Sequence, residues 1–494
     1  MSKFSEKCKA LLEENGTNVY RLSKSASLEH TTLQRMVTGK RRPNIEFVRN
    51  FCRELRIPHA DELQLLQLYR MEEMGETTWR NRQSIIQVLN HLSDLEKSAS
   101  HIPESVPAVP IISQADRPIA VHTYEVELLL YSILTEEFVS EEKSWVYTNC
   151  SLHNGYFSHI LMLLCQHYPK KINVEQFVSF QLQNDGASYN LEMLSQILPL
   201  AFSESISYQV YYSYTRNDLK NELPLLFPYY VITPHHVLLL SSDLSEAVLH
   251  SETEIVTLYK KTFEKARNNG HPLIQSFSDP DEAAVAYLGK ITENDTNSYF
   301  HAMEYAPCPM DMAPLETFLE AASACPPKLQ EIAGYYVKTI QNIKNYHVQS
   351  CFTLPGLDTF CRTGRVSGNI GAFLPPASVP QRIEYLKNIL SFQVDDDIDR
   401  NHGMAMIAPE IFHIPSNLCI EMMERTCLNF LKIEKDFHFV FVFITESSIC
   451  DAFYEFMSAR ENADYILSPE ESKETICELL NKLEAMQAGQ THSN

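Results

Sequence analysis

The chain has 494 residues, of which 44% are hydrophobic, and carries 41 Lys and Arg against 63 Asp and Glu, a formal net charge of −22 at pH 7. The length predicts two or three domains, and the hydrophobic content can support a sizeable core. The acidic balance argues against a protein that coats nucleic acid or lies on an anionic membrane.

The first part of the chain shows the apolar spacing of short helices. Phe4–Leu12 carries an apolar stripe, and the NGT that follows it ends that helix. Asn18 is suited to cap a second helix, Gly39 to end a third, and Asn44 to cap a fourth. The apolar residues that these helices are expected to bury are Leu22, Leu28, Leu33, Met36, Ile45, Val48, Cys52 and Leu55. Two more helices are expected after them, over His59–Met74 and Thr77–Lys97.

Residues 98–120 hold four prolines and no helical period, so we expect an extended linker. Beyond it the pattern mixes strand and helix. Ile206–Tyr214 alternates like a strand, and Pro228–Asp243 is typical of a hairpin that turns at Pro234–His236. The further elements expected are a helix over Thr253–Ala266, a buried strand within His438–Ser448, and helices over Ile449–Ser458 and Glu471–Met486.

Charge is distributed unevenly between these regions. Residues 1–56 contain 12 Lys and Arg against 6 Asp and Glu, whereas residues 98–494 contain 25 against 50. A basic head on an acidic body favours a nucleic-acid-binding module joined to a part that phosphate repels.

Membrane and secretion signals are not expected. The most apolar run, Phe439–Ile444, is far shorter than the ~18 residues of a membrane span, and the N-terminus becomes acidic too early for a signal peptide. The 12 cysteines form no C-x-x-C pair and suit buried thiols in a reducing cytosol. We therefore expect a cytoplasmic protein with no membrane partner.

The first 65 residues resemble a known family through a whole pattern. NVYRLSKSASL at Asn18–Leu28 fits a second helix and its turn, EHTTLQRMVTGKRRP at Glu29–Pro43 a third helix with a basic loop, and NIEFVRNFCRELRI at Asn44–Ile57 a fourth helix. With the stripe at Phe4–Leu12, this pattern resembles the Cro/repressor (Xre-type) helix-turn-helix regulators. The resemblance implies a bacterial-type transcription regulator whose third helix recognises DNA.

The side chains of the third helix and the loop suit the two kinds of DNA contact. Gln34 can pair with adenine and Arg35 with guanine in the major groove, whereas a basic loop suits phosphates. Side chains near helix starts can add contacts to the DNA backbone. The predicted DNA-binding residues are His30, Thr31, Thr32, Gln34, Arg35, Lys40, Arg41, Arg42, Tyr20, Lys24 and Asn44.

Three positions depart from the family pattern. Ser23 replaces the usual Ala, and Val19 replaces a Gln that commonly contacts the DNA backbone. Ser27 stands where Gly is usual, at a cost on the order of 1 kcal/mol if the turn needs a positive φ. The alternative interpretation is a helical bundle used for dimerisation, with GKRRP as a solvated loop, but the charge asymmetry favours DNA binding.

Catalytic signatures are absent from the body: no H-E-x-x-H, G-x-S-x-G or Walker G-x-x-x-x-G-K occurs, so we predict neither an enzyme nor a cofactor. Gly364–Gly371 is better interpreted as a loop than a phosphate cradle, and Asp395–Asp399 as an acidic loop than a calcium site. His235 and His236 are interpreted as turn residues rather than metal ligands. The body faintly resembles phospholipase D-like domains, but that family's H-x-K motif is missing.

The fold class expected is therefore α+β multidomain: an all-α helix-turn-helix bundle at 1–97, the linker at 98–120, and a mixed α/β body whose halves, 121–290 and 291–494, are weakly similar. The function expected is a homodimeric regulator that binds a double-stranded DNA operator and senses a small-molecule or peptide effector through its body, with the helix over Thr77–Lys97 as a candidate seam. Two alternatives stay open, a DNA-binding head on an enzyme and a peptide-responsive scaffold. The aromatic strands, Tyr208–Tyr214 and Phe227–Tyr230, are more typical of core and rim packing than of a ligand site, but they are the first place to search for a small-molecule pocket.

Overall fold

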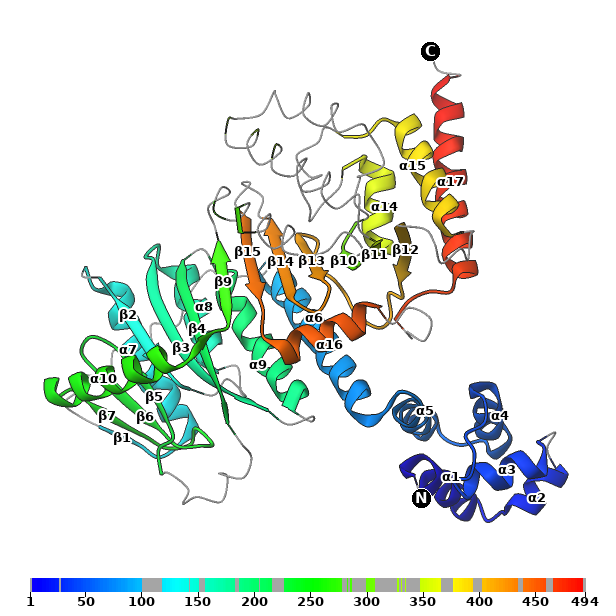
Figure 1. Cartoon of the computed structure of the whole chain (residues 1–494), viewed down its shortest axis with the longest axis horizontal. Helices are drawn as coiled ribbons and strands as arrows, with labels where there is room; N and C mark the ends of the chain where they lie inside the picture. Colours follow the sequence, from blue (N-terminus) through cyan, green and yellow to red (C-terminus); the bar gives the residue numbers. More distant parts are fainter. Residues whose placement is uncertain are drawn as a thin grey trace. The chain divides into compact units, whose positions relative to one another are not determined.

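The computed structural model describes residues 2–25, 28–99, 118–141, 143–150, 156–182, 186–203, 205–215, 226–277, 299–306, 347–365, 376–393, 402–433, 439–458 and 465–491, with positions 282, 285, 286, 327, 330 and 334. Its contacts divide the chain into two units, residues 1–83 and 84–494, each described here by itself. The first is helical and the second contains two mixed sheets with their covering helices, so the predicted α+β class is confirmed (Figure 1).

The helices predicted in the first hundred residues are present, and side-chain caps explain where three of them begin. Asn18 accepts a hydrogen bond from the backbone N–H of Arg21, and Asn44 from that of Phe47, both at 2.9 Å. Ser2 caps the first helix in the same way. The helices are α1 Lys3–Glu14, α2 Val19–Ser25, α3 His30–Val37, α4 Ile45–Leu55, α5 His59–Met74 and α6 Glu76–Ala99.

The inward stripes of α1 to α5 meet in one core. Leu33 and Met36 of α3 are fully buried, as is Val48 of α4, and Phe4 packs edge-to-face against Tyr69 with ring centroids 5.5 Å apart. Burying side chains of this size stabilises a fold by roughly 2 kcal/mol each. The core holds α3 firmly while leaving its other face exposed.

The first sheet of the body has the strand order β1-β7-β6-β5-β2-β3-β4-β8. The predicted hairpin is confirmed, since Ile232 pairs with Val237 across the turn. Its strands are β1 Ile119–Ala120, β2 Trp145–Thr148, β3 Ile172–Gln181, β4 Ile206–Thr215, β5 Tyr229–Ile232, β6 Val237–Leu240, β7 Ala247–His250 and β8 His271–Pro272.

Alternation along β3 explains how helices cover both faces of this sheet. Val174 and Val178 join the core that includes α9, whereas Phe177 joins the cluster under α10. The helices of this half are α7 Thr123–Val139, α8 Tyr156–His167, α9 Gly186–Ala201 and α10 Thr253–Asn269.

The second sheet has the order β12-β11-β10-β13-β14-β15-β9. The predicted buried strand is its β15, and the predicted helices after it are α16 and α17. The elements are β9 Ile274–Phe277, β10 Tyr299–Glu304, β11 His347–Thr353, α14 Leu354–Thr363, α15 Val379–Gln393, β12 His402–Ile407, β13 Leu418–Met423, β14 Cys427–Ile433, β15 Phe439–Ile444, α16 Ser447–Ser458 and α17 Pro469–Thr491.

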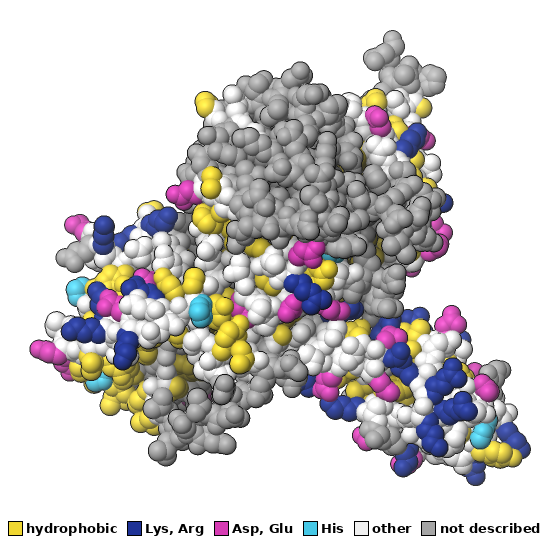
Figure 2. Space-filling model, in the orientation of Figure 1, with side chains coloured by type: hydrophobic (Ala, Val, Ile, Leu, Met, Phe, Trp, Pro, Cys, Tyr) yellow, Lys and Arg dark blue, Asp and Glu magenta, His cyan; other side chains and the backbone are white. Residues whose placement is uncertain are grey.

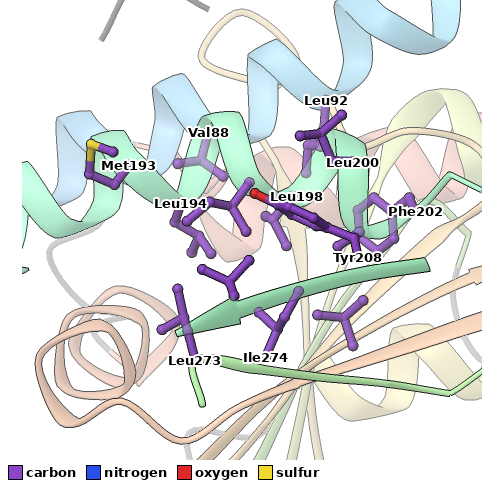
Figure 3. Close-up of a cluster of buried hydrophobic side chains, with 14 of the residues drawn as sticks. Val88, Leu92, Met193, Leu194, Leu198, Leu200, Phe202, Tyr208, Leu273 and Ile274 are labelled. Atoms are coloured by element: carbon purple, nitrogen blue, oxygen red, sulfur yellow. The ribbon is translucent and has the colours of Figure 1, made fainter. Parts of the chain in front are cut away.

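One large apolar core serves both sheets and includes the second half of α6. Figure 3 shows Val88 of α6 beside Leu194 of α9 and Leu92 of α6 beside Leu200 of α9, and Tyr208 of β4 and Leu273 belong to the same cluster. The end of the predicted linker belongs to the fold, because β1 pairs with β7. The linker's middle, Ser27, the acidic stretch Asp395–Asp399 and most of the Gly-rich stretch lie outside the described residues.

Candidate nucleic-acid interface

The third helix ends in a glycine-dependent motif that positions the basic loop. Gly39 has φ +70°, a conformation that favours glycine. Its N–H donates to the carbonyl of Met36, and the N–H of Lys40 donates to that of Arg35 at 2.9 Å. These two bonds form a Schellman motif. The TGK sequence thus stops α3 and turns the chain into the loop at a fixed point.

The outer face of α3 carries the predicted base-reading residues. His30, Thr31, Gln34 and Arg35 are all exposed, while Leu33 between them is fully buried. Residues four apart on a helix lie on the same face, so His30 neighbours Gln34, and Thr31 neighbours Arg35. The structure therefore brings donors and acceptors together on one exposed surface.

An aromatic cluster joins α2 to the start of α3. Tyr20 is 58% exposed, and its ring lies edge-to-face with that of His30 at 6.4 Å between centroids. The Lys24 ammonium lies over the same Tyr20 ring, 4.6 Å from its centroid. The sequence predicts these three residues as DNA contacts separately, and only the structure shows that Tyr20 links the other two.

The basic loop divides into two parts. Lys40 and Arg41 are exposed, whereas Arg42 is half-buried against α5. An Nη2 of Arg42 lies 3.3 Å from the Glu73 carboxylate, and its guanidinium lies over the ring of Tyr69. Arg42 is therefore held by protein groups and acts first as an anchor of the loop, a role that its place in GKRRP did not reveal.

The residue Tyr69 fixes the end of that loop. Its hydroxyl donates to the carbonyl of Pro43 at 2.9 Å, and burial raises the pKa of this hydroxyl, with the charge of Arg42 opposing the rise. A phenol with a raised pKa stays protonated and keeps its donor role at neutral pH. The loop that presents Lys40 and Arg41 is thus attached to α5 at both Arg42 and Pro43.

Two other predicted residues have local partners. The hydroxyl of Thr32 donates to the Glu29 carboxylate at 2.7 Å, and Asn44 uses its side-chain oxygen to cap α4. Glu29 is not among the residues predicted from the sequence, although its charge lies at the start of α3. Val19 packs half-buried against the core. Figure 2 shows Lys and Arg side chains gathered on one face of this helical unit.

Replacing Asn44 tests its role as the cap of α4. We expect Asn44→Ala to lower the stability of the helical unit by about 1 kcal/mol through loss of the cap. Asn44→Asp keeps an acceptor at the helix start and adds a charge that phosphate repels. Hydrogen exchange of α4 in the full chain should rise for the Ala variant alone. Equal exchange in all three proteins would show that the cap contributes nothing.

In the body, the two histidines of the hairpin turn differ in burial. His235 is exposed, whereas His236 is 2% exposed, with Nδ1 3.0 Å from the Ser251 hydroxyl and Nε2 3.1 Å from the Glu136 carboxylate. Burial lowers the pKa of His236, against the opposing charge of Glu136. In the part of the chain that is described, no three His, Cys, Asp or Glu side chains are grouped as metal ligands.

The aromatic strand β4 packs into the core and also borders a cavity. Tyr208 and Tyr211 line a space of about 620 Å³ between β4 and β9. Tyr208 is itself buried, and its hydroxyl donates to the side-chain oxygen of Gln176. Among the described helices none is long and apolar enough to cross a membrane.

Comparisons with known proteins leave the family open. No family model matches the chain, and no curated protein does. One solved structure with a likeness is TrmBL2, an archaeal chromatin protein reported to bind DNA: 13% identity, TM-score 0.19, 44% of this chain and 71% of that one covered. Another is the phosphatidylserine synthase of Haemophilus influenzae Rd KW20: 9% identity, TM-score 0.24, 81% of this chain and 99% of that one covered.

Proposed function

We propose that the chain is a sequence-specific DNA-binding transcription regulator of the Cro/repressor (Xre) type. In this proposal α3 lies in the major groove, where Gln34 and Arg35 read base edges, and Lys40 and Arg41 hold phosphates. The observation that carries the proposal is the exposed polar face of α3, which ends in a basic loop anchored by Arg42 and Tyr69.

The body takes the sensing role in this proposal. A ligand or partner that binds one conformation of the body more tightly than another changes the affinity for DNA. The factor by which it does so equals the factor by which DNA changes the affinity for that ligand. A homodimer would place two helical units on half-sites about one helical turn apart, which predicts a palindromic operator. The acidic charge of residues 98–494 keeps this part of the protein off non-specific DNA.

Selection from a randomised DNA pool tests the proposal. The full-length protein and a Gln34→Ala/Arg35→Ala variant are each taken through selection at two salt concentrations. We expect the wild type to enrich a palindromic site, and the variant to keep only salt-sensitive binding without a preferred sequence. If neither protein enriches a sequence, α3 does not read bases and the bundle serves another purpose, such as dimerisation.

A further inference from the structure

The cavity beside β4 lies where two strands diverge. Residues 271–277 form one extended segment that first accompanies β4: Pro272 pairs with Tyr211, and the N–H of Leu273 donates to the carbonyl of Val210 at 2.8 Å. From Ile274 onward the same segment pairs with β15 of the other sheet. β4 and β9 therefore separate beyond Val210 like the arms of a fork, and they lie side by side in Figure 1.

The β4 arm of the fork presents backbone hydrogen-bonding groups. The carbonyl of Ser205 accepts from Ile172 on the β3 side, and that of Val210 accepts from Leu273 on the opposite side. Because these directions alternate along a strand, Ile206 and Tyr208 direct their backbone N–H and C=O away from β3. Among the described strands, this part of β4 is paired with β3 alone.

The β9 arm forms the other wall. It is the terminal strand of the second sheet. One of its edges pairs with β15, and the other edge pairs with none of the described strands of that sheet. Unpaired strand edges are templates for another strand. Here two such edges border one cavity.

The space between the arms suits a short peptide. Its volume of about 620 Å³ falls within the range of ligand-binding pockets, about 300–1,000 Å³. The residues that line it include the apolar Ile206 and Val440, which also belong to the core, and the polar Ser207 and Gln275. Lys171 is the one charged side chain among the described residues of the lining.

We propose that this fork binds an extended peptide with an acidic group, which enters as a β-strand between β4 and β9. The strand edges supply main-chain hydrogen bonds to the peptide. Its alternating side chains contact the apolar and the polar residues of the lining, and its carboxylate pairs with the Lys171 ammonium. Such a peptide would join the two sheets of the body through hydrogen bonds. The inference names the ligand class for the sensing role proposed above, but it concerns the body alone.

Selection of peptides tests this inference without DNA. A phage-displayed library of random heptapeptides is panned against the full-length protein, and enriched peptides are synthesised with a fluorescent label. We expect enriched peptides to alternate apolar and polar residues and to contain Asp or Glu. N-methylation at alternate residues removes the donors to one arm, and methylation of the other residues removes those to the second arm. Each set should weaken binding on the order of 10- to 100-fold.

Protein variants locate the bound peptide. Ser276→Trp, which fills the cavity from β9, should abolish peptide binding. Lys171→Glu should lower the affinity for acidic peptides by about fivefold. Lys261→Glu, an exposed charge reversal on α10 outside the lining, should leave binding unchanged. Far-UV circular dichroism and thermal unfolding confirm that each variant is folded.

Four outcomes would overturn the inference. They are an absence of enriched peptides, binding that neither set of N-methyl groups weakens, binding that only one of the two sets weakens, and binding that a folded Ser276→Trp variant retains. A failure here leaves the DNA selection unaffected, and a failure of DNA selection leaves the peptide assay unaffected, so the two proposals are tested separately.

Discussion

Replacing Arg35 by alanine is expected to remove discrimination at one base pair of the selected operator, while replacing Lys40 is expected to weaken binding to every sequence alike. Arg35 is exposed on α3 and can make a bidentate pair with guanine, worth about 1–3 kcal/mol of discrimination. Lys40 follows the helix in the anchored loop, where it suits a phosphate. The two cations therefore contribute in different ways to the same complex.

The measurement is the affinity for the selected site and for single-base variants of it over a range of salt concentrations. Arg35→Ala should bind the selected site and the variant altered at the base pair that Arg35 reads with equal affinity. Lys40→Ala should keep the preference but reduce the slope of log affinity against log salt by about 1. Lys9→Ala, an exposed cation on α1, is the matched control and should change neither quantity. If Arg35→Ala lowers only the salt slope, the residue contacts phosphate and the assignment of base reading is wrong.

Replacing Gly356 by alanine is expected to destabilise the body strongly. Gly356 lies in the first turn of α14, where a Cβ would lie 1.7 Å from the carbonyl oxygen of Tyr305. That carbonyl cannot move freely, because it accepts hydrogen bonds from both the backbone N–H and the hydroxyl of Thr353. The backbone must shift, at the upper end of overpacking costs, about 3 kcal/mol.

Thermal unfolding of the full chain by circular dichroism checks this prediction. A loss of this size should lower the body's unfolding temperature by on the order of 5 °C or prevent the variant from accumulating in soluble form. Gly334→Ala is the control, because a Cβ there would meet no atom of the described part of the chain within 4 Å. An unchanged transition in Gly356→Ala would mean that α14 adjusts its position against Tyr305 at little cost.

Local signals explain why the helical unit was predictable. Asn18 and Asn44 cap the helices that follow them within three residues, and Gly39 ends α3 through bonds to the preceding turn. The hairpin at Pro234–His236 was equally local, since its paired strands are adjacent in sequence. Interactions of this range leave a pattern in a short window of sequence.

Long-range pairing left no such pattern. β9 pairs with β15 across more than 160 residues, and β10 and β11 are parallel neighbours joined by a long connection. The anchoring of Arg42 by Glu73 depends on how α5 folds back, so spacing within GKRRP could not predict it. The aromatic residues of β4 are typical of packing as much as of a pocket, and only the divergence of two strands shows where the cavity lies.

The helix α6 determines where the body can be detached from the rest of the chain. Ile85, Val88, Leu89 and Leu92 belong to the same apolar core as both sheets. A fragment that starts at residue 121 lacks these side chains and exposes the apolar surface of α9 against which they pack, which favours aggregation. A fragment that starts at residue 84 or earlier retains them. The second half of α6 is therefore a part of the body that folds with it, although it precedes the Pro-rich stretch in sequence.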